Sequence, residues 1–169
     1  MGLLHIFDSS DMRIRQTVNA RSTPGTVTRL PVSDGDKFAD ALDSLVSASS
    51  TFDRVLFETH GGPGLIEFGG KSITADWWRW AARWRKYTRL TTAGARVYFN
   101  GCNVSEGPSG WDFLEAAAAV FLTPGGGTVF GQTSVGFGNP FNGHVVHFWG
   151  STRTLFVARD GRIIKRLEE

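Results

Sequence analysis

Short apolar runs that end in glycine-rich turns alternate along this chain with segments of helical period, and this alternation most constrains its fold. Val55-Leu56-Phe57 and Val97-Tyr98-Phe99 are the clearest runs, typical of strands buried on both faces. The segment 37–48 instead carries the i, i+4, i+7, i+8 pattern of a helix, at Phe38, Leu42, Leu45 and Val46. Strands that alternate with helices form parallel sheets covered by helices. We therefore expect an α/β chain, a three-layer αβα sandwich around a mostly parallel sheet.

The same reasoning places the other elements. Turn residues and periodicity predict strands at 3–7, 26–32, 53–59, 95–99, 128–130, 145–149 and 155–157, and helices at about 74–87 and 109–122. Residues 13–18 alternate and are expected to pair with 3–7, and 131–143 is expected to be a glycine-rich loop. Gly69-Gly70 predicts a small hairpin of 65–68 with 71–74, and Asp160-Gly161 predicts a turn that pairs 155–157 with 163–164. No repeat or linker interrupts the chain, so we expect one domain over residues 1–169.

Composition narrows the class of protein. The 41% hydrophobic and 20% charged content of the 169 residues excludes a disordered chain, a coiled coil and collagen. The net charge of +2 indicates no particular partner, and a single cysteine excludes an intramolecular disulfide or a multi-cysteine zinc site. No apolar run is long enough to span a bilayer, and the first residues lack the pattern of a signal peptide. We expect a cytoplasmic protein, although export by a route that needs no signal peptide stays open.

Two reactive residues follow consecutive predicted strands. His60 comes after Val55-Leu56-Phe57, and Cys102 comes after Val97-Tyr98-Phe99. Because ligands bind beyond the carboxyl ends of parallel strands, both side chains are expected at one edge of the sheet. A thiol needs a base such as imidazole to become a nucleophile, and the backbone amides of Gly61 and Cys102 would then hold the oxyanion. The histidine precedes the cysteine by 42 residues, the order found in caspases rather than in papain.

Each of these residues also has a structural interpretation. A lone cysteine is usually an inert buried side chain, and a histidine beside glycines is often only a turn residue. Glu58, two residues before His60 on the predicted strand, is expected either to orient the imidazole or to form an unrelated ion pair. Asn100, two residues before Cys102, is a further candidate supporting residue.

The residues around His60 and Cys102 are similar to motifs of a known superfamily. The segment 57–69, FETHGGPGLIEFG, resembles the histidine motif of the caspase-like (clan CD) cysteine peptidases, and 98–107, YFNGCNVSEG, resembles their cysteine motif. The nearest likeness is to an uncharacterised bacterial branch found in large surface proteins. It spans about residues 25–135, with Gly110, Phe113-Leu114 and the segment 128–131 where that branch has a helix and its next strand. The resemblance implies a caspase-hemoglobinase fold, with His60 as general acid and base and Cys102 as nucleophile.

The chain also departs from the caspases. Where they use Gln and Arg around the cysteine to recognise aspartate, this chain has Asn100 and Asn103, so specificity for aspartate is unsupported. We expect a cysteine-dependent hydrolase, an endopeptidase that cleaves a protein or peptide through an acyl-enzyme, without a cofactor or metal. Because the superfamily includes members that have lost activity, a non-catalytic binding or effector module is the alternative. A cysteine acyltransferase with the same dyad is a third possibility.

Other signals in the sequence are weaker. The segment 60–64, HGGPG, also matches the oxyanion motif of α/β-hydrolase iminopeptidases, but neither Ser109 nor Ser134 lies on the serine elbow that this fold needs. His144 and His147 could suggest a metal. Three residues apart on a strand, however, they point to opposite faces, and no carboxylate cluster accompanies them, so structural roles are favoured.

The most conspicuous helical segment is rich in tryptophan. At 100° per residue its aromatic side chains share one face and its cations lie opposite: Trp77, Trp80, Trp84 and Tyr87 against Arg79, Arg83 and Lys86. Such a helix can bind a membrane surface or an acidic partner. We favour the simpler interpretation, in which the tryptophans pack on the sheet, so binding to a membrane surface is not expected. The ordered aromatics of nucleic-acid-binding modules are absent, and nucleic acid is not an expected partner.

Overall fold

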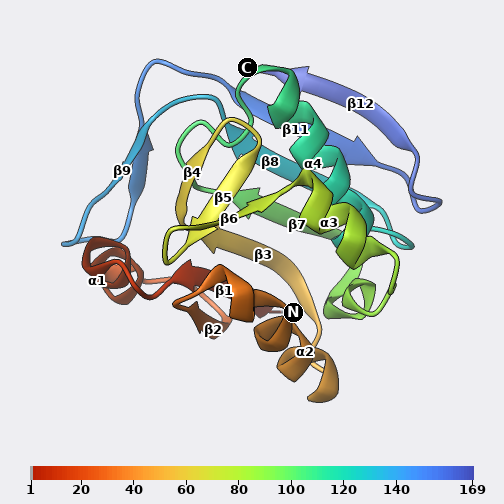
Figure 1. Ribbon diagram of the computed structural model, residues 1–169, viewed down its shortest axis with the longest axis horizontal. Coiled ribbons are helices and arrows are strands. Elements are labelled where there is room, and N and C mark those ends of the chain that lie inside the picture. Colours follow the sequence, from red (N-terminus) through yellow and green to blue (C-terminus); the bar gives the residue numbers. More distant parts are fainter. Residues whose placement is uncertain (1) are drawn as a thin grey trace.

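A seven-stranded sheet forms the centre of the protein in a computed structural model that describes residues 2–169 (Figure 1). Its strand order is β12-β11-β8-β7-β3-β1-β2. The bounds are β1 Gly2–Asp8, β2 Thr26–Val32, β3 Phe52–Glu58, β7 Thr91–Phe99, β8 Gly127–Gln132, β11 Thr152–Val157 and β12 Ile163–Glu168. Strands β2, β1, β3, β7 and β8 are parallel, whereas β11 and β12 are antiparallel to their neighbours. The prediction of a mostly parallel α/β sheet is confirmed.

One row of side chains across the sheet shows why these segments pair. Leu4, Val55, Val97, Val129 and Leu155 lie opposite one another on five adjacent strands, and each is fully buried. The register is fixed because a shift of one residue would turn the whole row to the other face. This row forms the floor of the main hydrophobic core.

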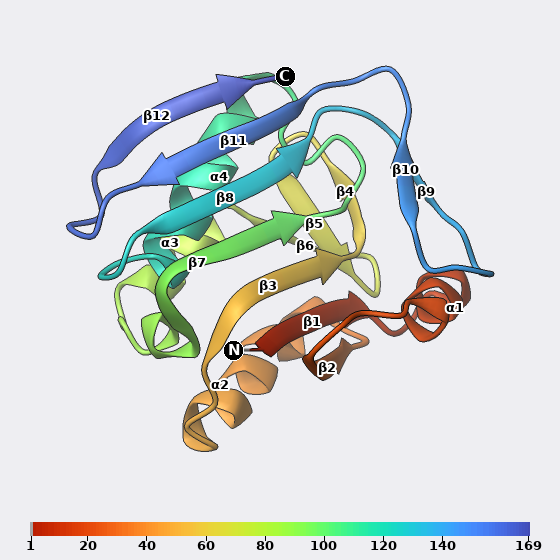
Figure 2. The ribbon, with the colours of Figure 1, turned by 180° about the vertical axis from the view of Figure 1, so that it is seen from behind.

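Three helices cover this core face: α2 Phe38–Ser47, α3 Ala75–Ala82 and α4 Gly107–Phe121. Seen from behind in Figure 2, the strands lie in front of α3 and α4. Of the α-helices within residues 2–169, only α1 lies outside this layer, so the expected second helical layer is reduced to one short helix. The handedness of the connections explains this difference. The crossovers β2→β3, β3→β7 and β7→β8 run in one direction across the sheet, so right-handed connections place all their helices on one face. Only β1→β2 runs the other way.

The connection from β1 to β2 contains a helix, so the prediction of a strand at 13–18 is wrong. Helix α1 covers Met12–Ala20 and lies beyond the carboxyl end of β1 (Figure 1). Asp11 begins it, because Asp11 Oδ1 accepts a hydrogen bond from the Ile14 amide at 2.9 Å. Such an N-cap satisfies one of the free amides of the first turn, which favours the helix over the strand that the alternation suggested.

The tryptophan helix also differs from its prediction. Helix α3 ends at Ala82, one turn earlier than expected, and a separate 3₁₀ turn, Tyr87–Leu90, follows. Trp78 is fully buried, whereas Trp80 and Trp84 are 43% and 61% exposed, so the prediction that these two pack on the sheet is wrong. Trp78 instead contacts aromatic rings from the sheet and from two other helices: Phe38, Phe57, Phe99, Phe113 and Phe121.

Two small antiparallel sheets flank the carboxyl edge of the central one. The predicted hairpin is present as β5 Leu65–Phe68 and β6 Lys71–Thr74, and β4 His60–Gly62 adds a third strand. Within the predicted loop 131–143, β9 Gly136–Gly138 pairs with β10 Val145–His147. The segment from 133 to 151, called the arm below, thus runs as a hairpin beside α1, and it carries the second wall of the candidate site (Figure 2).

Candidate active site

Adjacent parallel strands bring the two candidate motifs to one edge of the sheet. Phe57 of β3 pairs with Phe99 of β7, and the Asn100 amide donates to the Phe57 carbonyl at 2.9 Å. The chain leaves β3 toward His60 and leaves β7 toward Cys102 just beyond this pair. The carboxyl ends of parallel strands are where ligands bind in open α/β sheets.

Glycines allow the turn that follows β3 and the turn that follows β7 to come into contact. A Cβ atom on Gly101 would lie 3.2 Å from the His60 carbonyl oxygen, and one on Gly61 would lie 2.7 Å from Val104 Cγ2 and 2.9 Å from the Cys102 carbonyl oxygen. Contacts below 3 Å are too close for a real side chain, so Gly61 is needed for this approach.

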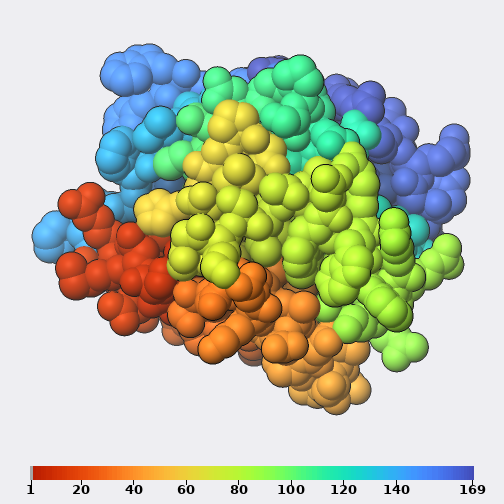
Figure 3. Space-filling view, viewed as in Figure 1, coloured from red at the N-terminus to blue at the C-terminus, as the bar shows by residue number. Residues whose placement is uncertain are grey.

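His60 and Cys102 line a single pocket of about 380 Å³. Its walls come from α1 (Asp11, Arg13, Ile14, Thr17), from the ends of β3 and β7 (Glu58, Thr59, His60, Asn100, Cys102) and from the arm (Val135, Gly136, Phe137, Gly138, Val145). In the space-filling view, α1 in red and the arm in light blue lie at the same side of the molecule, next to the yellow atoms that follow β3 (Figure 3). The pocket therefore lies where three distant parts of the sequence meet.

Asp11 supplies the carboxylate that contacts the imidazole. His60 Nε2 lies 3.0 Å from Asp11 Oδ2, while Asp11 Oδ1 holds the Ile14 amide. The hydrogen bond from Ile14, followed by the one with His60, lowers the pKa of Asp11 below its ordinary value. The sequence analysis did not identify Asp11 as a site residue. Its position as the N-cap of a helix was the one local signal that could have identified it.

The thiol of Cys102 is half-buried and faces the arm. The Gly136 amide lies 3.3 Å from Sγ and donates to it, and the thiol can donate to the Gly136 carbonyl oxygen at 3.5 Å. Among residues 2–169, no hydrogen bond joins Cys102 to His60, and the Cys102 amide has no protein acceptor.

The other two candidate supporting residues have different surroundings. Glu58 is buried, and its Oε2 lies 2.9 Å from His5 Nε2 and 3.2 Å from Arg21 Nη2. Of the two roles expected for Glu58, the structure thus shows an ion pair and no contact with His60. Asn100 lines the pocket between the two motifs.

The remaining candidate residues lie outside this pocket. His147 packs its ring against Gly136, its Nδ1 lies 3.4 Å from the Ser134 carbonyl oxygen, and burial lowers its pKa. Within residues 2–169, no group of three His, Cys, Asp or Glu side chains is placed to hold a metal ion. Ser109 lies on α4, and Ser134 lies on the arm.

Comparison of the chain with protein-family models, with curated proteins and with solved structures gives no match in any of the three. None of the helices within residues 2–169 has the length and apolar content needed to cross a membrane.

Proposed function

We propose that this protein is a cysteine-dependent hydrolase, an endopeptidase that uses His60 and Cys102 through an acyl-enzyme. One observation carries the proposal: the only thiol of the chain and a carboxylate-paired imidazole line the same open pocket at the carboxyl edge of a parallel sheet. The sheet and the placement of the two motifs are compatible with the caspase-hemoglobinase fold that the sequence resemblance implies.

The proposed reaction has two halves. His60 takes the proton of the Cys102 thiol, and the thiolate attacks the substrate carbonyl carbon to form a tetrahedral oxyanion. The amides of Gly61 and Cys102 would hold this oxyanion. His60 then gives the proton to the leaving amine as the C–N bond breaks, which leaves a thioester on Cys102. Water, deprotonated by His60, attacks the thioester, and the thiol is regenerated with release of the acid.

Asp11 is a positioning residue in this scheme. Because it contacts Nε2 of His60, it leaves Nδ1 as the nitrogen that can exchange a proton with the thiol. Contacts between catalytic groups are often long in an enzyme without substrate, so we expect substrate binding to bring the imidazole and the thiol together.

A non-catalytic binding module is the second candidate, and one observation favours it. The thiol is engaged by the Gly136 backbone and the imidazole by Asp11, so both reactive groups already have partners. An acyltransferase would share the first half-reaction and differ only in the acceptor of the acyl group.

The rate of reaction with iodoacetamide separates the first two candidates. The single cysteine makes the label report on Cys102 alone. For the hydrolase we expect folded protein at neutral pH to react at least about tenfold faster than the same chain in urea, and His60→Ala to remove the advantage. A slow thiol that is indifferent to His60→Ala would favour the binding module. Cleavage of a diverse peptide mixture by the wild type and not by Cys102→Ala would then establish the peptidase.

A further inference from the structure

The arm beside the pocket exposes an unusual amount of apolar surface. Four large apolar side chains that lie close together are partly or fully exposed to solvent: Val135, Phe137, Phe148 and Trp149. Exposed apolar side chains scattered singly need no explanation, but a contiguous group of them marks a binding surface.

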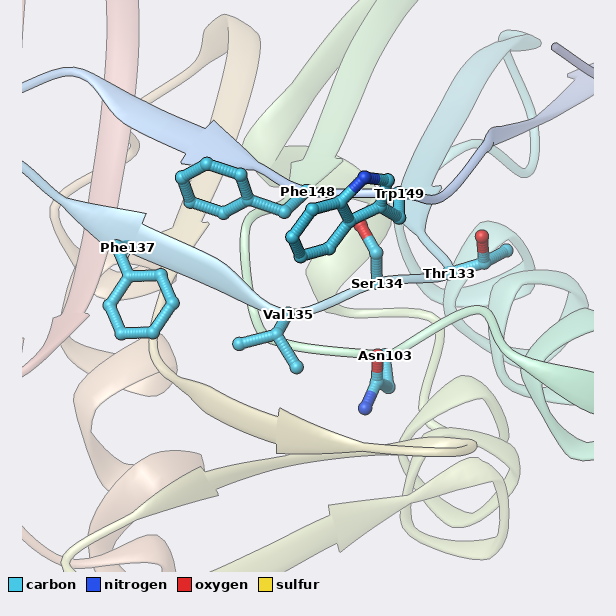
Figure 4. Close-up of a pocket in the computed structure, with 7 residues that line it drawn as sticks. All are labelled: Asn103, Thr133, Ser134, Val135, Phe137, Phe148 and Trp149. Atoms are coloured by element: carbon cyan, nitrogen blue, oxygen red, sulfur yellow. The ribbon is translucent and has the colours of Figure 1, made fainter.

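A second pocket of about 350 Å³ lies within this group (Figure 4). Phe137 comes from β9, Phe148 and Trp149 follow β10, and Asn103 rises from the turn after β7, with Ser134 and Val135 between them. Among residues 2–169, no charged side chain lines it, so its surface fits an apolar group with at most a few polar contacts at the rim.

This second pocket adjoins the proposed catalytic pocket. Val135 and Phe137 line both of them. Asn103 directly follows Cys102, and its amide donates to the Ser134 carbonyl at 3.0 Å, which fixes the thiol-bearing turn to the arm. A chain whose carbonyl lies at Cys102 would therefore present its neighbouring side chains to the aromatic pocket.

Trp149 adds an independent observation. Its backbone φ is +48°, in the left-handed region that bulky residues avoid, and its side chain is fully exposed. Because the Trp149 side chain is not buried in the free protein, its packing does not offset the free-energy cost of this backbone conformation. Residues with such strained backbones cluster at ligand sites. Tryptophan is also the residue most enriched among the side chains that dominate binding energy.

We propose that this second pocket is a substrate subsite that takes an apolar side chain, aromatic or branched aliphatic, close to the bond that Cys102 attacks. This inference rests on the proposed function, and it names the class of substrate: peptides with a bulky apolar residue near the scissile bond. Trp149 and Phe148 are its specificity-determining residues.

The test uses alkylation, which needs no turnover. Iodoacetamide, N-(2-phenylethyl)iodoacetamide and N-(3-phenylpropyl)iodoacetamide all form the same C–S bond at Cys102 with loss of iodide. The measured quantity is the rate of each phenyl reagent relative to iodoacetamide, normalised to the same ratio in urea. We expect a ratio of about ten for at least one phenyl reagent, which corresponds to roughly 55 Å² of apolar reagent surface leaving water. Trp149→Ala should lower that ratio to about two or less.

Phe141→Ala is the matched control, since Phe141 is an exposed aromatic of the same arm that does not line the pocket. It should leave the ratio unchanged. A wild-type ratio near one for both phenyl reagents, or equal ratios in wild type and Trp149→Ala, would overturn the subsite. Failure of the proposed function looks different: the absolute iodoacetamide rate would then be slow and independent of His60, whatever the ratio.

Discussion

Asp11 offers the sharpest test because its two carboxylate oxygens serve different partners. Oδ1 accepts the Ile14 amide at 2.9 Å and caps α1, whereas Oδ2 contacts His60 Nε2 at 3.0 Å. Asparagine keeps the capping oxygen and replaces the other oxygen by an NH₂ group, while alanine removes both. The pair Asp11→Asn and Asp11→Ala therefore separates the stability of the helix from the orientation of the imidazole.

The magnitudes follow from these contacts. Loss of an N-cap costs about 1 kcal/mol, and asparagine caps nearly as well as aspartate. In urea unfolding we expect Asp11→Ala to lower the free energy of unfolding by about 1 kcal/mol and Asp11→Asn by less than about 0.5 kcal/mol. A partly exposed ion pair contributes at most about 1 kcal/mol, so the iodoacetamide rate of Cys102 should fall up to about fivefold in both variants.

The pH dependence has a definite sign. Because the pKa of Asp11 in the folded protein lies below its ordinary value of 3.8, its ionised form contributes stability above that pH. The contribution is lost as the pH falls through the folded-state value. The difference in stability between wild type and Asp11→Asn should therefore vanish at low pH. Asp34→Ala is the control for the iodoacetamide rate, because Asp34 also caps a helix, the 3₁₀ helix Gly35–Lys37, but does not line the pocket. Should Asp11→Asn alkylate at the wild-type rate, Asp11 does not position His60.

Two further perturbations test the packing around the site. Trp78→Ala should lower the free energy of unfolding by about 3–5 kcal/mol, because it empties a fully buried site, whereas Trp84→Ala should change it by less than about 0.5 kcal/mol. Equal effects in urea unfolding would contradict the placement of α3. In Gly136→Ala the new Cβ would lie 2.6 Å from the His147 ring, so β9 and β10 should separate and shift the Gly136 backbone that contacts Cys102, at a cost of about 1–3 kcal/mol. An unchanged iodoacetamide rate in this variant would show that the Gly136 backbone does not hold the thiol.

Local sequence determined the strands and the place of the two reactive residues. The apolar segments Val55-Leu56-Phe57 and Val97-Tyr98-Phe99 favour strands that are buried inside a sheet. The glycines that follow them allow the chain to turn at the carboxyl edge of this sheet. Parallel pairing of consecutive strands then leads His60 and Cys102 to one edge. The hairpin at Gly69-Gly70 is equally local, because both glycines adopt the positive φ that such a turn requires.

Tertiary structure decided which faces and which charges meet. Residues 74–87 offer more than one apolar face, and the rotation of α3 on the sheet selected Trp78 over Trp80 and Trp84. Glu58 pairs with His5, 53 residues away, and Asp11 pairs with His60, 49 residues away. Periodicity reports only on neighbours along one element, whereas these pairings depend on the handedness of the connections and on where α1 leaves the sheet. Helices α2, α3 and α4 lie on one face for the same reason: strand order and crossover direction are properties of the whole chain.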